Sequence, residues 1–134
     1  YFGPWNREIP EIPVVYVGFW TDKGNADPDT LALLKELRNK KVFLFGTAGF
    51  GESPAYFEKV LCAVRAALDD SNQILGTFMC QGKMPQAVKD RYLRMKAQPE
   101  HPANIDALIA NFDRALSHPD EADLERLRQL VQGL

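Results

Sequence analysis

Two short apolar stretches, separated by a helical pattern, constrain the fold of this chain more than any other feature. The first, Val14–Trp20, reads VVYVGFW, and the second, Val42–Gly51, reads VFLFGTAGFG. Continuous apolar runs of this length, rich in valine and aromatic residues, predict β-strands that are buried on both faces. Two such strands joined by a helix form a right-handed crossover and lie parallel. We therefore predict a parallel sheet.

Each of these stretches ends in a glycine-containing loop. The loops are Thr21–Asp27 and Thr47–Glu52. Parallel strands bring their carboxyl ends to one edge of the sheet, and ligands bind at that edge. We therefore expect both loops to open onto one crevice, and we look there for the function.

The same alternation continues along the chain. Asp27-Pro28 and Ser53-Pro54 each combine an N-cap residue with a first-turn proline, so they predict helices that run to about Arg38 and about Leu68. Ile74–Cys80 predicts a further strand, interrupted by Gly76, and Gln81–Met84 a third loop on the same edge.

From about Pro85 the apolar spacing becomes entirely helical and predicts three helices, which form a C-terminal helical extension. At the other end, Tyr1–Gly3 is interpreted as the tail of a strand and the proline-rich Pro4–Pro13 as a loop. Alternating strands and helices favour an α/β fold, a three-layer sandwich with helices on both faces of a parallel sheet. Residues 1–134 are expected to form a single domain.

Composition excludes several classes of function. The chain has 134 residues, of which 46% are hydrophobic and 25% charged, and its net charge is −2. This balance argues against a nucleic-acid-binding protein, which would show a basic face. No apolar run is long enough for a membrane span, and no secretory signal is recognised. The two cysteines, Cys62 and Cys80, are expected to stay unpaired, on a helix facing the core and at a strand end, which favours a cytoplasmic location.

The glycine-rich stretch Gly46–Gly51 has two interpretations besides a tight turn. It lacks the G-x-G-x-x-G spacing and a Walker lysine, so it is a weak signal for phosphate. Glycines also let a backbone approach a flat ligand closely, and Trp20, Phe50 and Tyr56 could stack on such a ligand. Trp20 is equally typical of a core residue, so both interpretations stay open.

No catalytic residue or metal site is predicted. Cys80 ends a strand at the active edge beside Gln81-Gly82-Lys83, a segment whose role stays open, but buried free cysteines are common and no base stands near it in the sequence. His101 and His118 lack the spacing of metal ligands. Asp120, Glu121 and Asp123 are interpreted as complements of a helix dipole.

Four separated blocks resemble the short flavodoxin-like proteins that occur widely in anaerobic bacteria. They are YVGFWTDKG (Tyr16–Gly24), KKVFLFGTAGFG (Lys40–Gly51), GTFMCQGKMP (Gly76–Pro85) and LSHPDEADL (Leu116–Leu124). The resemblance implies a flavodoxin fold, with strand order 2-1-3-4-5 and FMN at the carboxyl edge of the sheet.

The resemblance also implies the residues that would contact FMN. Two loops would flank its isoalloxazine ring: Trp20, Thr21, Asp22, Lys23 and Gly24, and then Thr47, Ala48, Gly49, Phe50 and Gly51. The T-G-N-T-like loop that cradles the phosphate in this family is not found among these residues. We therefore expect the first strand, the phosphate loop and the first helix of the fold to lie before Tyr1, which would make the domain N-terminally incomplete.

The function implied by the resemblance is electron transfer by an FMN protein between redox partner proteins. An electron carrier is favoured over an enzyme, because no acid–base pair is evident in the sequence. The first alternative is an FMN-dependent reductase that acts on a quinone or another small aromatic acceptor. The second is a non-flavin interaction module that shares the fold.

Overall fold

The computed structural model describes residues 1–9, 11–51 and 53–134, so Pro10 and Glu52, which fall in two of the predicted loops, lie outside the described residues. Strands and helices alternate and are followed by helices alone. The elements are β1 (Val14–Asp22), β2 (Asn25–Ala26), α1 (Pro28–Glu36), β3 (Lys41–Ala48), α2 (Pro54–Arg65), β4 (Gln73–Gln81), α3 (Gln86–Lys96), α4 (Ile105–Ala115) and α5 (Glu121–Gln132).

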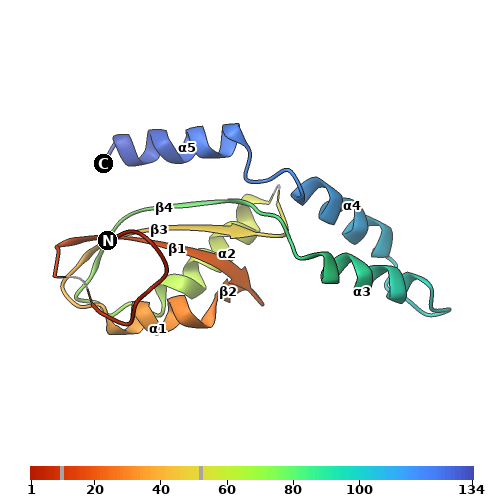
Figure 1. Ribbon diagram of the computed structural model, residues 1–134, viewed down its shortest axis with the longest axis horizontal. Coiled ribbons are helices and arrows are strands. Elements are labelled where there is room, and N and C mark those ends of the chain that lie inside the picture. Colours follow the sequence, from red (N-terminus) through yellow and green to blue (C-terminus); the bar gives the residue numbers. More distant parts are fainter. Residues whose placement is uncertain (10, 52) are drawn as a thin grey trace.

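The four strands of the described chain form one sheet in the order β2-β1-β3-β4. β3 pairs in parallel with β1 on one side and with β4 on the other, as the sequence predicted. α1 and α2 cover one face of the sheet and α5 lies over the other, which gives the predicted three layers of an α/β sandwich (Figure 1).

The starts of α1 and α2 follow from their capping residues. The Asp27 carboxylate accepts a hydrogen bond from the Thr30 backbone N–H at 3.2 Å, and the Ser53 hydroxyl accepts one from the Tyr56 N–H at 3.2 Å. Each satisfies a backbone donor that has no partner inside its helix. Both predicted N-caps are therefore confirmed.

The main core lies between the sheet and the layer of α1 and α2. Residues from β1, β2, β3 and both helices meet there: Val17, Phe19, Ala26, Leu34, Leu37, Val42, Leu44, Val60, Leu61 and Val64. A smaller cluster on the opposite face joins Phe43, Phe78 and Cys80 to Leu127 and Val131 of α5. The central strand β3 contributes to both clusters, so its predicted burial on both faces is confirmed.

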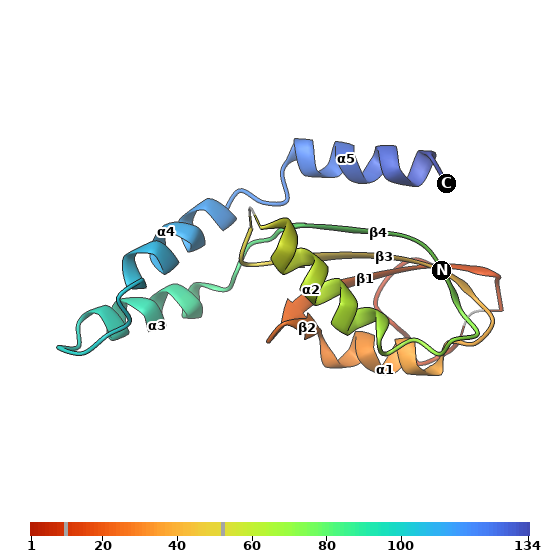
Figure 2. The same cartoon turned by 180° about the vertical axis from the view of Figure 1, so that it is seen from behind.

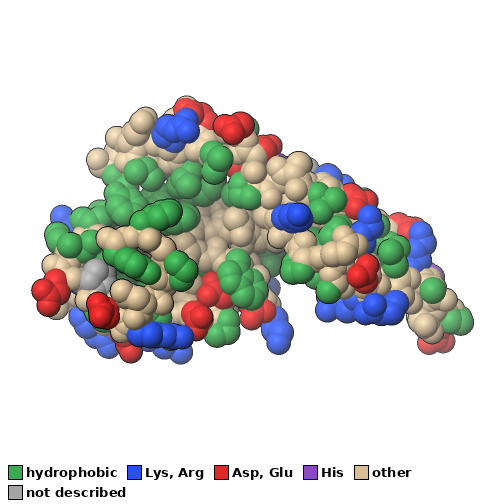
Figure 3. Space-filling model, viewed as in Figure 1, with side chains coloured by type: hydrophobic (Ala, Val, Ile, Leu, Met, Phe, Trp, Pro, Cys, Tyr) green, Lys and Arg blue, Asp and Glu red, His purple; other side chains and the backbone are tan. Residues whose placement is uncertain are grey.

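The same prediction was wrong for β1. Val17 and Phe19 are buried, but Tyr16 and Trp20, which point to the other face, are about half exposed. The reason is the position of α5, which packs on β4 and leaves the β1 side of this face uncovered within the described chain. Figure 3 shows hydrophobic side chains around the hollow between α5 and the sheet.

The pairing of β4 with β3 is irregular next to Gly76. The register of β4 against β3 shifts between Val42 and Phe43, so that Ile74 faces Val42 and Gly76 faces Phe43. One extra residue in a strand moves the following side chains to the opposite face. A Cβ atom at Gly76 would lie 3.0 Å from the Phe43 ring, which favours glycine there. The predicted interruption of the strand is therefore a bulge.

The predicted helical extension divides into two parts. α3 and α4 pack on each other as a hairpin that projects beyond the carboxyl edge of the sheet, whereas α5 returns over the sheet (Figures 1 and 2). We call the α3–α4 hairpin the arm; its own core contains Tyr92, Ile105 and Phe112. None of the helices among the described residues is long and apolar enough to traverse a membrane.

Tyr1–Gly3 does not form the predicted strand. Tyr1 and Phe2 are exposed and make no strand pairing. A strand needs a neighbour that accepts and donates its backbone hydrogen bonds, and no described strand runs beside these residues. The expectation that a further strand and helix precede Tyr1 stays a prediction.

Candidate functional site

The two predicted loops lie side by side at the carboxyl edge of the sheet. Trp20 of β1 stands in register with Thr47 of β3. The Thr21 hydroxyl donates a hydrogen bond to the Thr47 carbonyl oxygen at 2.8 Å, which ties the two loops together. We call Thr47–Gly51 the glycine loop.

The loop after β1 is a tight hairpin, a feature that the sequence analysis missed. Asp22 pairs with Asn25 across a two-residue turn, and Lys23 and Gly24 both have positive φ angles of 51° and 81°. This is the backbone pattern of the two-residue hairpin turns that match the twist of the strands. Lysine seldom adopts a positive φ, so Lys-Gly is a weaker signal than Asn-Gly.

The exposure of Trp20 excludes one of its two interpretations. Its side chain is 56% exposed, so the core interpretation is wrong. Phe50, in the glycine loop, is 41% exposed and packs edge-on against the Tyr56 ring, with 6.0 Å between the centroids. Two partly exposed aromatic side chains therefore lie at this edge, Trp20 near the end of β1 and Phe50 in the glycine loop. Their contact with a cofactor stays a prediction.

The glycines of the glycine loop have a packing role that the sequence analysis did not foresee. A Cβ atom at Gly49 would lie 2.5 Å from the Met84 sulfur, and one at Gly51 would lie 2.6 Å from Gln81 Oε1. The side chains of Gln81, at the end of β4, and of Met84, in the segment after it, thus fill the space beside these glycines. Their small size lets the chain pack against itself there.

Two buried amides that sequence reasoning missed also contact the glycine loop. Gln81, at the end of β4, and Asn111, in the middle of α4, both donate hydrogen bonds to the Gly49 carbonyl oxygen. The sequence holds one signal for this contact, because Asn111 interrupts the apolar stripe formed by Leu108, Ile109 and Phe112. Its partner, 62 residues away, gives no local signal.

A cavity of about 350 Å³ opens beside the end of β4. It lies among the start of α2, the end of β4 and the start of α5, and its lining residues are Ser53, Pro54, Phe57, Cys80, Gln81, His118, Asp123 and Arg126. This is the carboxyl edge again, where open α/β sheets bind ligands.

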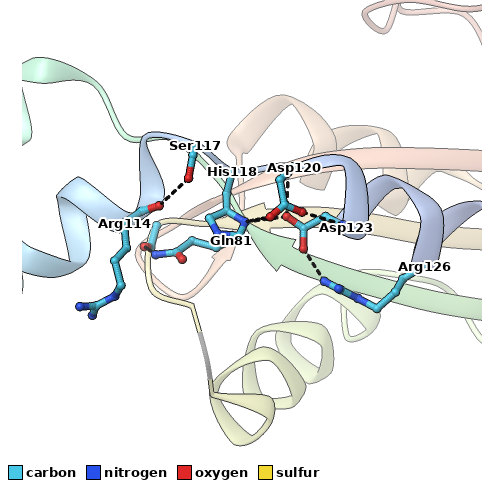
Figure 4. Close-up of polar contacts among 8 residues, drawn as sticks. Gln81, Arg114, Ser117, His118, Asp120, Asp123 and Arg126 are labelled. Carbon is cyan, nitrogen blue, oxygen red and sulfur yellow. Dashed lines mark hydrogen bonds and ion pairs between the residues drawn. The ribbon is translucent and has the colours of Figure 1, made fainter.

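His118 and Asp123 both line this cavity, and their side chains contact each other directly (Figure 4). His118 Nδ1 lies 2.6 Å from Asp123 Oδ2. The same carboxylate accepts a hydrogen bond from the Asp120 backbone N–H at 2.9 Å and contacts Arg126, and the Asp120 side chain caps α5 in return. His118, Asp120 and Asp123 place possible ligand atoms within 4.8 Å of one another.

The electrostatics of this group fit a helix cap. The hydrogen bond to Asp123 raises the pKa of His118, and burial opposes it only in part. Burial raises the pKa of Asp123, but hydrogen bonds from Asp120, His118 and Arg126 outweigh it and hold the pKa below its ordinary range. Asp123 therefore stays ionised and holds the imidazole in place. The prediction of a dipole role fits Asp123, but it missed His118 and Arg126.

The predicted position is correct for Cys80 and wrong for Cys62. Both are free, and Cys80 is buried at the end of β4 as predicted. Cys62 is exposed, so the prediction that it faces the core was wrong: α2 buries Val60, Leu61 and Val64 instead. Burial, with a smaller contribution from the Asp123 charge, raises the pKa of the Cys80 thiol to about 11. This favours the neutral thiol over a nucleophile.

Comparison with known proteins gives a consistent result. The family model described as Flavodoxin domain matches residues 5–132. A flavodoxin-like domain-containing protein BilS of Clostridium symbiosum (strain WAL-14163) is 41% identical over an alignment of 134 positions. The alignment covers 96% of this chain and 70% of the relative. A protein of the same name from Clostridioides difficile (strain CD3) is 35% identical over 122 residues, or 90% of this chain and 69% of the relative.

The His118–Asp123 pair predicts a pH-dependent stability. A raised folded-state pKa means that His118 stabilises the fold fully below its ordinary pKa of about 6.5, and that this contribution is lost as the pH rises through the higher folded value. We expect His118→Gln to lower the free energy of unfolding most at mildly acidic pH and least in alkaline solution. Urea unfolding across this range measures it, with His101→Gln as the control. Parallel profiles for wild type and His118→Gln would contradict the assignment.

The cysteines predict unequal reactivity. Because burial raises the pKa of the Cys80 thiol to about 11 and shields the sulfur from solvent, this thiol should alkylate far more slowly than that of exposed Cys62. Mass spectrometry after timed iodoacetamide treatment measures both rates. Both thiols should react at similar rates in denaturant. Equal rates in the folded protein would contradict the burial of Cys80.

Proposed function

The chain belongs to the flavodoxin family, and on this premise we propose that it holds FMN and carries electrons between redox partner proteins. The observation that carries the proposal is the pair of partly exposed aromatic side chains, Trp20 and Phe50, at the carboxyl edge of the sheet. They stand near the ends of β1 and β3, which the Thr21–Thr47 hydrogen bond joins. FMN would supply the redox chemistry through its isoalloxazine ring.

The residues at this edge suit a flat heterocycle. Trp20 would stack on one side of the ring, and Phe50 would approach it from the other loop. Backbone groups of Trp20–Gly24 and Thr47–Gly51 would offer hydrogen bonds to its polar rim. The site needs little from charged side chains, because an isoalloxazine ring presents flat apolar faces and an edge of nitrogen and oxygen atoms.

The phosphate of FMN needs further donors. Lys23 and Lys83 are the cations in the sequences of the three edge loops. Protein sites usually bind a phosphate group by backbone amides at the start of a helix, where the helix dipole also favours negative charge. We therefore propose that a phosphate-binding segment outside residues 1–134 completes the FMN site.

The proposal includes the surroundings in which the protein works. Two free thiols, Cys62 and Cys80, suit the reducing conditions of the cytoplasm. A net charge of −2 suits docking against a basic face of a redox partner, because complementary charges speed encounter.

One observation favours the alternative of an FMN-dependent reductase for a small aromatic acceptor. His118 is held by buried Asp123 beside a cavity at the same edge, and such an imidazole can donate a proton. Oxidation of NAD(P)H by the isolated flavin-loaded protein with a quinone would support the reductase. Turnover only with partner proteins would support the carrier, and a colourless protein that binds no flavin would support the non-flavin module.

The proposal that a further segment binds the phosphate of FMN predicts different FMN affinities for two proteins. The 134-residue chain should bind FMN at least about tenfold more weakly than the same chain preceded by a strand, a T-G-N-T loop and a helix of flavodoxin sequence, because charge-assisted hydrogen bonds to the phosphate are then added. Quenching of FMN fluorescence measures both affinities. Tight binding by the 134-residue chain would place the phosphate among the edge loops, whereas no binding by either protein would count against FMN.

Trp20→Ala, in the chain that carries the phosphate segment, should weaken FMN binding by roughly 5- to 150-fold, because an aromatic stack contributes about 1–3 kcal/mol in comparable complexes. Phe50→Ala should act in the same direction more mildly. The free energy of unfolding should fall by only about 1 kcal/mol for exposed Trp20, against about 2–5 kcal/mol for the fully buried Leu44→Ala control. A stability loss with unchanged affinity per folded molecule would exclude Trp20 as the stacking residue.

A further inference from the structure

The geometry points to Gln81 and Asn111 as positioning residues that fix the Gly49 peptide, and with it the glycine loop, for contact with the flavin ring. We call this pair the amide clamp. The inference rests on the proposed function, because it assigns to the clamp the orientation of a loop that would contact FMN. It also makes α4, and hence the arm, a structural part of the cofactor site.

The clamp is a closed set of hydrogen bonds. Gln81 Nε2 donates to the Gly49 carbonyl oxygen at 2.9 Å and to Asn111 Oδ1 at 3.0 Å, and Asn111 Nδ2 donates to the same Gly49 oxygen at 3.0 Å. Gln81 is 7% exposed and Asn111 is 8% exposed. A carbonyl oxygen has two lone pairs, so both amides can use it at once. Buried networks of this kind hold one arrangement, since water cannot replace a lost partner.

The packing around the clamp serves the same arrangement. The glycine loop approaches Gln81 and Met84 so closely that side chains at Gly49 and Gly51 would collide with them. The Gly82 N–H donates to the Ala48 carbonyl oxygen at 2.9 Å, so backbone and side chain hold the loop from the same side. An apolar residue in place of Asn111 could fill the volume, but it could not fix the direction of the Gly49 carbonyl.

The direction of this carbonyl determines the direction of the next N–H. In a trans peptide the C=O of Gly49 and the N–H of Phe50 point to opposite sides of the chain. Because the clamp draws the Gly49 oxygen toward β4 and α4, the Phe50 N–H is directed away from them. The clamp therefore fixes the direction of the Phe50 N–H donor. It also fixes the position of the Phe50 backbone nitrogen, and Phe50 carries the exposed ring.

Asn111→Leu tests the clamp in the FMN-binding protein. We expect a 3- to 10-fold faster release of FMN, of the order that one lost hydrogen bond produces, and a shift in the visible spectrum and midpoint potential of the bound flavin. Gln81→Leu should act alike, and the double variant should weaken binding by less than the product of the two single effects, because the pair acts as a unit. Asn111→Ala, which removes the amide without adding bulk or charge, replaces Asn111→Leu if that variant fails to fold.

Asn72 provides a matched control at the opposite end of the sheet. Its Nδ2 donates to the Leu37 and Asp69 carbonyl oxygens at 2.9 and 3.0 Å, and its Oδ1 accepts from the Lys40 N–H at 3.0 Å. Asn72→Leu should lower the stability of the fold but leave FMN release, spectrum and potential unchanged. Equal flavin properties in wild type and folded clamp variants would overturn the inference.

Hydrogen exchange separates the clamp from the proposed function. In the protein without ligand, Asn111→Leu should speed amide exchange in the glycine loop, whereas Asn72→Leu should not. Unchanged exchange in this loop would overturn the clamp. Failure of the wild-type protein to bind FMN would instead count against the proposed function, and the exchange result would still decide whether the clamp fixes the loop.

Discussion

The two-sided pairing of β3 is the constraint on which the rest of the structure depends. β3 is paired in parallel with β1 and β4, and residues such as Phe43 and Leu44 are buried on its opposite faces. Parallel pairing brings the ends of all three strands to one edge of the sheet. Every polar group of the candidate site stands at this edge or on a helix that follows it, so the location of the site is a consequence of the pairing.

Two polar networks stabilise this edge by different means. The network of Gln81 and Asn111 is neutral and nearly excluded from water. The network of His118, Asp123 and Arg126 is charged, and its cations reach solvent while the carboxylate is buried. A neutral network keeps its geometry at any pH at which the protein folds, whereas the charged one changes with the protonation of its histidine. The hydrogen bonds between the two amides and Gly49 therefore involve no group that titrates, whereas the cap of α5 involves His118.

Local patterns were sufficient to predict most of the fold. Apolar runs located the parallel strands, and Asp27-Pro28 and Ser53-Pro54 located two helix starts, because these features act over a few residues. The failures have two causes. The exposure of Tyr16 and the missing strand at Tyr1–Gly3 depend on which distant element covers or pairs a residue. The exposure of Cys62 is a local matter, because Val60, Leu61 and Val64 form the buried face of α2 and Cys62 lies off that face.

The candidate site was predictable in part, for the same reason. The position of the two loops follows from strand order, which the alternation of elements implies. The clamp does not, because Gly49 and Asn111 lie 62 residues apart and meet only when α4, the second helix of the arm, packs beside the glycine loop. His118 and Asp123 are only five positions apart in the sequence. The cavity that they line also includes Ser53 and Cys80, which come from distant parts of the chain. Sequence spacing could locate that cap, not the cavity beside it.

An exposed aromatic ring serves binding best when its backbone is rigid. The Asp27 carboxylate that caps α1 also accepts from the Trp20 N–H at 3.3 Å, and the Asp27 N–H donates to the Trp20 carbonyl oxygen at 3.1 Å. One residue therefore links the start of a helix to the strand end that carries the ring. Exposure of an apolar ring costs solvation free energy, but fixing its backbone beforehand reduces the entropy lost when a ligand stacks on it. In the proposed site the amide clamp would have the same effect on the Phe50 side, so that both aromatic side chains would stand on backbone that is already fixed when a ligand binds.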